Sequence, residues 1–293
     1  MGQWGSVMNW NEYFRERNRE MEAREREVRE SVQQVTLTLR EEFQRFAHEF
    51  EIDQQRIGDP DVLRMPAAIG CEPGNIEFGC GGTLAKWSAA GAVVHHLVCT
   101  DGSKGTWDAN ADTVALVASR QAEQRDAAAA LGATGTVSFL GYVDGDLEHS
   151  KEATERIALA IRQIKPDVVL SHDPWKRYRL HPDHRHAGLL ACEGIVAARD
   201  PHFFRDHGLP PHRPETLLLW EADEPDHAED VSTFVATKLR ALEAHASQFE
   251  STMKARDEDQ LKAFRSRVRS RLAGHGSRFG FGAAELFKRI TDL

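Results

Sequence analysis

The chain has 293 residues, of which 41% are hydrophobic and 28% are charged, and its formal net charge at pH 7 is −9. This length predicts one sizeable domain with an appendage rather than two full domains. The acidic balance argues against a nucleic-acid binder, because no net positive field would offset repulsion by phosphates.

Membrane-spanning and exported proteins are also disfavoured. No stretch approaches the roughly 18 to 20 apolar residues that cross a bilayer, and the first residues carry Trp, Glu and Arg in place of an apolar signal core. The chain has few cysteines, namely Cys71, Cys80, Cys99 and Cys192. This is typical of reduced thiols in a reducing compartment. We therefore expect a soluble, cytoplasmic protein. Cys71 and Cys80 could in principle bind metal, but they lack the short spacing of thiolate sites.

Residues 1–60 are predicted to form a charged helical arm. From residue 11 to about 50 the sequence is dense in Glu and Arg and has no Pro or Gly, which favours one long helix. Apolar residues recur there every seven positions: Phe14, Met21, Val28 and Val35. This spacing is typical of a helix that packs on another helix. The arm could join two copies into a homo-oligomer or lie on its own domain, and the pattern leaves both open.

Residues 61–273 are predicted to form the globular domain. Strands are expected at 67–71, 93–99, 137–140, 167–171 and 217–220. Helices are expected at 82–90, 114–131, 151–164, 231–249 and 258–272. Residues 274–293 are expected to be a tail with a short helix at 283–290. Because strands and helices alternate through the first part, we expect an α/β fold with a mostly parallel sheet and helices on both faces.

Three polar segments follow predicted strands, at 72–75, 100–107 and 172–184. In open parallel sheets, ligands bind outside the carboxyl ends of the strands. We therefore expect these segments to meet at one edge of the sheet.

The segment 172–184 ends in the motif His181-Pro182-Asp183-His184. A lone His-x-x-His carries little information, but here Leu180, Arg185 and the preceding strand favour a functional site. The alternative is that the two histidines only pack the loop.

Several motifs in order resemble the LmbE-like, or PIG-L, family of zinc-dependent N-deacetylases. They are the His181–His184 motif, the segments 70–84, 97–102, 140–145 and 245–248, and Arg120 with Glu123. The resemblance covers about residues 67 to 253. It implies a Rossmann-like sheet, a Zn²⁺ cofactor and a substrate that is an acetylated amino sugar, namely an N-acetylglucosamine-containing small molecule.

The resemblance also assigns roles, and the first motif departs from the family there. Where the family has His-Pro-Asp-Asp, this chain has Glu72-Pro73-Gly74-Asn75. The metal positions implied are His184, Glu72 and Asn75. The general base falls on Gly74, which has no side chain, so Glu72 is the candidate for a displaced base as well as for a ligand.

The second motif keeps its residue types. His181 resembles the family histidine that stabilises the oxyanion and protonates the leaving amine, and Asp183 resembles the carboxylate that orients it.

Candidate substrate-binding residues come from the surrounding segments. Arg120 matches a family position near substrate, although a surface ion pair with Glu123 explains it equally well. Trp107 could line a sugar pocket, and Asp144 is interpreted as a turn residue with a substrate contact. Arg177, like Arg179, could hold an anionic group of the substrate or belong to a solvated loop.

Two hypotheses follow. The first is a family enzyme that hydrolyses the N-acetyl group of an N-acetylglucosamine-containing small molecule with altered metal chemistry. The second is a pseudoenzyme that binds a sugar-like ligand or a protein partner without catalysis.

Overall fold

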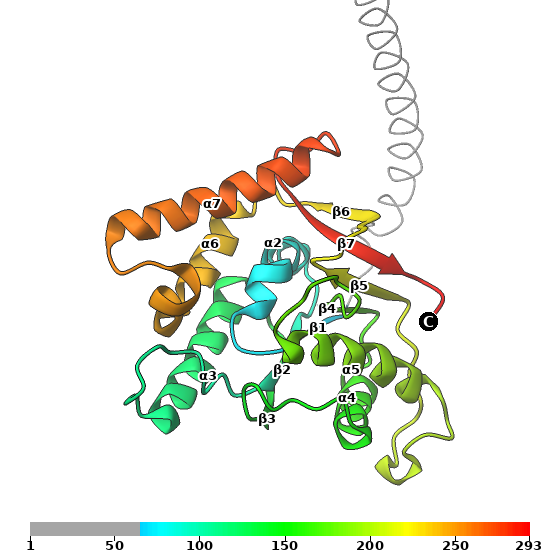
Figure 1. Ribbon diagram of the computed structural model, residues 1–293. Helices are drawn as coiled ribbons and strands as arrows, with labels where there is room; N and C mark the ends of the chain where they lie inside the picture. The colour runs from blue at the N-terminus through cyan, green and yellow to red at the C-terminus, as the bar shows by residue number, and fades with distance from the viewer. Residues whose placement is uncertain (1–64) are drawn as a thin grey trace, which may run out of the picture. The chain divides into compact units, whose positions relative to one another are not determined.

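The computed structural model describes residues 65–293. The predicted arm at 1–60 lies outside the described residues, and its role in oligomerisation stays a prediction. The described residues form a seven-stranded sheet in the order β3-β2-β1-β4-β5-β7-β6 (Figure 1).

The parallel part of the sheet contains β1 Pro66–Gly70, β2 His95–Thr100, β3 Val137–Tyr142, β4 Val168–His172 and β5 Thr216–Trp220. The strands β6 His227–Asp230 and β7 Ala284–Ile290 extend it in antiparallel pairing. Every residue of β1, β4 and β5 is buried. Continuous burial of this kind is expected where helices cover both faces of a parallel sheet.

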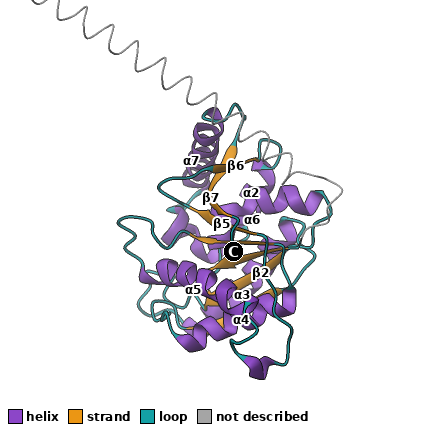
Figure 2. Ribbon diagram, turned by 90° about the vertical axis from the view of Figure 1, so that its right-hand side faces the viewer, coloured by secondary structure: helices purple, strands orange, loops and turns teal. Residues whose placement is uncertain are grey.

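The long helices are α2 Asn75–Ala89, α3 Thr113–Ala130, α4 Lys151–Ile164, α5 Pro182–Arg199, α6 Val235–Glu243 and α7 Glu258–Ser277. Short 3-10 helices lie at η1 Arg205–His207 and η2 Ala246–Gln248, and a π-helix at η3 Phe249–Met253. Helices α2 and α3 pack against α6, whereas α4 packs against α5. Figure 2 shows the strands between these layers of helices.

Local capping explains where several helices begin. The side chains of Asp112, Ser150 and Asp257 accept hydrogen bonds from backbone N–H groups in the first turns of α3, α4 and α7. These bonds satisfy donors that the helix itself leaves unpaired.

The topology places a crevice between β1 and β4. Chain connections run from β1 outward to β2 and β3, then return across to β4 and β5. The strand order therefore reverses between β1 and β4, which is where such sheets bind ligands. The loops after these two strands are the two that carry the motifs.

The α/β class and the mostly parallel sheet are confirmed, and α4 has the predicted bounds. The short helix predicted at 283–290 is wrong, because Ala284–Ile290 is strand β7. Its Ala, Glu, Leu and Lys favour helix locally, but pairing with β5 and β6 decides its conformation. These residues therefore belong to the sheet and not to a separate tail.

Three other elements differ from expectation. Helix α2 begins at Asn75 rather than near residue 82. The predicted helix at 231–249 is shorter, because β6 ends at Asp230 and α6 starts at Val235. Helix α5 was not predicted, since its first turn is the motif itself. None of the helices between residues 65 and 293 combines the length and apolar character that crossing a bilayer requires.

Candidate functional site

The two motif loops lie next to each other at the crevice. Glu72 follows β1, and Asn75 is the first residue of α2. His172 ends β4, and His181 is the N-cap of α5. His184 belongs to the first turn of that helix. The structure thus brings Glu72, Asn75 and His184 together as expected.

The first loop is closed around Gly74. Gly74 has φ 97°, a conformation that favours glycine. Its N–H donates to Gln124 Oε1 at 2.9 Å, and Gln248 Nε2 donates to the Pro73 carbonyl at 2.6 Å. A Cβ atom at position 74 would lie 2.8 Å from Gln248 Nε2. Gln248 therefore fills the space beside the position where the family resemblance places its general base.

Glu72 lies among hydrogen-bond donors and cations. Its Oε1 is 3.5 Å from His184 Nε2, and its Oε2 is 3.8 Å from Arg120 Nη1. Asn75 Nδ2 donates to Glu72 Oε1 at 3.4 Å. Burial alone would raise the pKa of Glu72, but the interaction with His184 and the charge of Arg120 outweigh it, so the pKa is lowered. Glu72 is therefore an ionised carboxylate.

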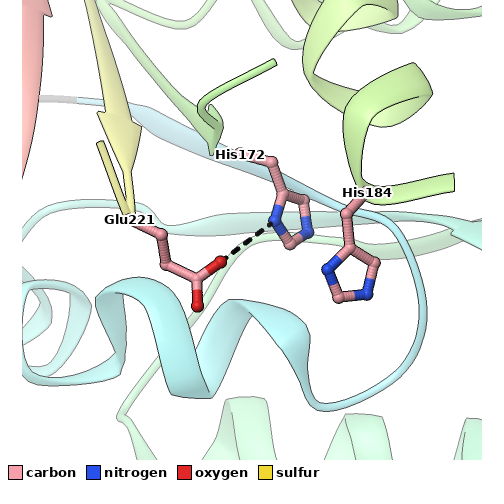
Figure 3. Close-up of side chains that lie close together, drawn as sticks. All are labelled: His172, His184 and Glu221. Atoms are coloured by element: carbon pink, nitrogen blue, oxygen red, sulfur yellow. Dashed lines mark ion pairs between the residues drawn. The ribbon is translucent and has the colours of Figure 1, made fainter. Parts of the chain in front are cut away.

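Three side chains of the crevice are grouped as metal ligands often are. His172, His184 and Glu221 each offer an atom within 4.8 Å of the others, and Figure 3 shows them converging from three segments. The two imidazole rings stack at 4.6 Å, and Glu221 Oε2 lies 3.9 Å from His172 Nδ1. This group could hold a metal ion if nothing else occupied it.

Arg179 contacts all three members of this group. Its Nη1 lies 3.2 Å from His172 Nδ1 and 3.1 Å from His184 Nδ1, and its Nη2 lies 2.9 Å from Glu221 Oε2. The Arg179 side chain is only 7% exposed. A guanidinium is permanently charged and can only donate hydrogen bonds. A metal ion at this group would have to displace it.

The donors around the rings also fix the histidine tautomers. Because Arg179 donates to His184 Nδ1, the proton of a neutral His184 is on Nε2. Trp220 Nε1 donates to His172 Nδ1 at 3.0 Å, which favours the proton of His172 on Nε2; that nitrogen lies 3.1 Å from Asn75 Oδ1, and the Cys71 N–H approaches it at 3.4 Å. Burial lowers the pKa of His172 well below its ordinary value, which keeps the ring neutral.

These tautomers oppose metal binding at the family positions. A metal-ligating histidine usually donates its other ring N–H to a carboxylate, carbonyl or water. Here the other nitrogen of each ring accepts instead, so N–H groups face Glu72 and Asn75. His184 Nε2 lies 3.5 Å from Glu72 Oε1 and would have to lose its proton to bind a metal, and the neighbouring family position is Asn75, a neutral amide. The residues present do not fit zinc.

The thiols offer no replacement ligand. Cys71 and Cys80 are free and buried, and burial raises the pKa of each well above its ordinary value. A thiolate is the metal-binding form of cysteine, so protonated buried thiols are poor ligands.

His181 lies at the mouth of the site. Its ring stacks on His184 at 4.9 Å, and its side chain is 43% exposed. The carboxylate nearby is Asp144, whose Oδ1 lies 4.0 Å from His181 Nε2. Asp183 instead accepts the Gly145 N–H at 2.6 Å through Oδ2. In this geometry Asp183 holds the Asp144–Gly145 turn, and Asp144 faces His181.

The remaining predicted residues divide into buried and exposed ones. Arg120 is 1% exposed and donates to the carbonyls of Gly102 and Pro73, so the alternative of a surface ion pair is wrong. Its expected partner Glu123 accepts from the N–H and hydroxyl of Ser247. Trp107 is 79% exposed, and Arg177 is largely exposed beside Asp223.

A cavity of about 710 Å³ opens over these side chains. The family positions Glu72, Asn75 and His184 line one wall, together with His172 and Trp220. Residues of α7 line another wall. The volume lies within the range of small-molecule sites, roughly 300 to 1,000 Å³. The other predicted site residues do not line it: Arg120, Asp144, His181, Asp183, Trp107 and Arg177.

Comparison with known proteins assigns the family. The PIG-L model, described as GlcNAc-PI de-N-acetylase, matches residues 69–194. The diacetylchitobiose deacetylase of Thermococcus kodakarensis is 35% identical over 199 residues, covering 66% of this chain and 74% of that protein. The chain belongs to the PIG-L family.

Two further PIG-L relatives agree. A 1D-myo-inositol 2-acetamido-2-deoxy-alpha-D-glucopyranoside deacetylase of Rhodococcus erythropolis is 29% identical, covering 61% of this chain and 79% of that protein. The structure of the N,N'-diacetylchitobiose deacetylase from Pyrococcus horikoshii superposes with a TM-score of 0.71 and 27% identity, covering 83% of this chain and 92% of that one.

Sequence reasoning missed two residues of this PIG-L site and did not foresee the role of two others. His172 and Glu221 each stand at or just after the carboxyl end of a strand, so topology alone could have singled them out. Arg179 was considered only as a contact for an anionic group. Gln248 was noted within a family segment, but its bond to the loop at Gly74 joins residues 175 positions apart in the sequence.

Proposed function

We propose that this PIG-L-family chain binds an N-acetylated amino sugar in the cavity over His184, and that it lacks metal-assisted hydrolysis of the acetyl amide. One observation carries the proposal: the position that the resemblance gives to the general base is Gly74, which has no side chain, and the Gln248 amide lies against the space that one would enter.

The ligand class is supported by the relatives. The Thermococcus and Rhodococcus proteins are named as deacetylases of diacetylchitobiose and of an acetamido-glucopyranoside. This chain carries the His181–His184 motif that the resemblance assigns to the family, and it has a cavity of suitable size. Trp220 borders that cavity but is only 1% exposed, so it forms part of the floor and presents no open ring face to a ligand.

The loss of hydrolysis follows from what the reaction needs. The family route uses a metal to activate water and a base to take its proton. Loss of a general base alone typically lowers a rate by roughly 10² to 10⁴. Here Arg179 also occupies the group formed by His172, His184 and Glu221. Fold and pocket can persist without this chemistry, because function depends on the site and not on the fold.

Deacetylation with Glu72 as base is the second candidate. It is favoured by the position of Glu72, 3.5 Å from His184 Nε2 and close to the exposed His181. However, the pKa of Glu72 is lowered. A base is most effective when its pKa is near the working pH, so Glu72 would be a weak one.

Binding and hydrolysis can be measured on the same protein. Titration calorimetry with N,N'-diacetylchitobiose tests binding, and release of acetate with and without added zinc tests turnover. We expect saturable binding and no acetate above background. Acetate release that Glu72→Gln abolishes would establish the second candidate. Absence of binding would contradict the proposed ligand class.

A further inference from the structure

One face of α7 carries a basic stripe that lines the same cavity. Arg267, Arg271, His275 and Arg278 are spaced by four, four and three residues, and all four line the cavity. Such spacing places side chains on one helix face. Lys254, just after η3, lines the cavity as well. The family positions and the basic stripe thus face one shared space.

The acidic residues of the cavity already have cationic or hydrogen-bonding partners. Asp223 pairs with Lys176 at 2.8 Å, and Glu285 pairs with Lys238 at 2.5 Å. Glu221 pairs with Arg179, and Glu72 lies beside His184 and Arg120. These contacts leave none of the cavity's carboxylates to neutralise α7.

The basic stripe has no such partners among residues 65–293. Arg267 donates to the Met253 carbonyl at 2.9 Å and lies over the Phe264 ring at 5.9 Å, and both contacts leave its charge in place. No ion pair joins Arg271 or Lys254 to a described carboxylate. Burial and the charge of Arg271 lower the pKa of His275, so the positive charge of the wall comes from its arginines and Lys254. The wall is therefore positive in a chain whose formal net charge is −9.

We propose that the ligand of this cavity is an acetylated amino sugar that carries an anionic group, a phosphate or a carboxylate, and that the basic stripe binds this group. The inference rests on the proposed function and narrows its ligand class. Guanidinium groups bind both anions through paired, charge-assisted hydrogen bonds.

The structure argues against the two arginines that the sequence suggested for binding an anionic group. The sequence suggested Arg177 and Arg179 for an anionic group. Arg177 lies 3.8 Å from Asp223, and Arg179 contacts Glu221 and the histidines. Arg271 is free of such contacts and lies near the middle of the basic stripe.

The test compares ligands that differ in charge. Calorimetric affinities of the full chain are measured for N-acetylglucosamine, N-acetylglucosamine 1-phosphate, N-acetylmuramic acid and inorganic phosphate. We expect at least one anionic sugar to bind roughly tenfold or more tighter than the neutral sugar. Arg271→Ala should remove that gain and leave the affinity for the neutral sugar unchanged. Arg269→Ala is the matched control, because Arg269 is exposed on the same helix and does not line the cavity.

Each outcome decides the matter. A gain with only one of the two anionic sugars identifies phosphate or carboxylate as the group. Equal affinity for neutral and anionic sugars, or equal losses in Arg271→Ala and Arg269→Ala, overturns the inference while sugar binding stands. If no sugar binds, the proposed function fails. Inorganic phosphate that binds the parent chain but not Arg271→Ala would then still support the anion site, and its absence would overturn that too.

Discussion

The two loops at the crevice differ in what they keep. The loop 72–75 has lost the residue types of its family motif, and Gln248 packs beside its Gly74. The loop 181–184 keeps every residue type, yet its polar atoms are turned to internal partners. Asp183 accepts from Gly145, and His184 accepts from Arg179. The intact motif therefore lacks the hydrogen-bond arrangement that metal binding requires.

This difference teaches that a metal site is a property of both loops together. With Glu72 and Asn75 in the first loop, the histidines beside it join a network of hydrogen-bond donors. In that network Trp220 donates to His172, and His172 Nε2 lies within hydrogen-bond distance of Asn75 Oδ1. A motif can therefore keep its residue types although the hydrogen bonds of those residues no longer suit metal binding.

Rebuilding the first loop should give the largest effect. We expect Glu72→His, Gly74→Asp and Asn75→Asp, combined with Gln248→Ala, to raise acetate release from diacetylchitobiose by about 10² or more, because base and ligands return. The added Gln248→Ala opens the space beside position 74. The measurement is a zinc-supplemented deacetylase assay.

Two controls sharpen that experiment. The same variant without Gly74→Asp should remain near background, since it regains ligands but no base. The variant with Gln248 kept should gain less. Equal activity in all three would mean that Gln248 and position 74 do not limit the reaction.

The second loop should be sensitive to how closely α5 approaches β4. A Cβ atom at Gly188 would lie 2.5 Å from the His172 carbonyl oxygen. We expect Gly188→Ala to lower the free energy of unfolding by about 1 to 3 kcal/mol, as overpacking against backbone does. Urea denaturation measures this.

Gly274 supplies the matched control in α7, where a Cβ would meet nothing within 4 Å. Gly274→Ala should stabilise by up to about 1 kcal/mol, because alanine favours helix. If Gly188→Ala were equally harmless, the close approach of α5 would not be what holds the second loop.

A side chain at position 74 of the first loop should lower the free energy of unfolding for two separable reasons. Gly74→Ala should cost about 1 to 2 kcal/mol of backbone strain at φ 97° in addition to the contact with Gln248. In the background of Gln248→Ala only the strain should remain. A double-mutant cycle in urea measures the difference, and strict additivity would show that Gln248 does not obstruct the position.

The smallest expected effect concerns a single proton. In the parent chain, ¹⁵N-edited NMR of the imidazole rings should show His184 with its proton on Nε2. Arg179→Met removes the donor to Nδ1 and should increase the population of the other tautomer. Arg177→Met is the control, because Arg177 contacts Asp223 and neither ring. An unchanged His184 spectrum in Arg179→Met would remove Arg179 as the cause.

The sequence predicts an element correctly where its local propensity agrees with the tertiary contacts that the element makes. Helix α4 has a strong capping serine and a clear apolar face, and its bounds were predicted. Strand β7 was not, because Glu285 is buried only through its bonds to Thr83, Gly82 and Lys238, which are distant in sequence. Pairing across the sheet overrides local propensity there.

Part of the candidate site could likewise be predicted from the sequence, and part could not. Motif order was enough to bring Glu72, Asn75 and His184 to one crevice. It could not reveal that Arg179 bridges His172, His184 and Glu221, since that contact depends on the conformation of the loop between β4 and α5. It also could not place α7 across the cavity. Loop and helix packing of this kind follows from tertiary contacts and not from periodicity.

Zinc titration calorimetry on the metal-stripped full chain, with His184→Ala beside it, tests the central claim most directly. The account predicts no saturable zinc binding at sub-micromolar concentration, and no difference between the parent and His184→Ala. One zinc ion bound tightly per chain and lost in His184→Ala would contradict it, because the crevice would then hold a metal despite Arg179 and Asn75.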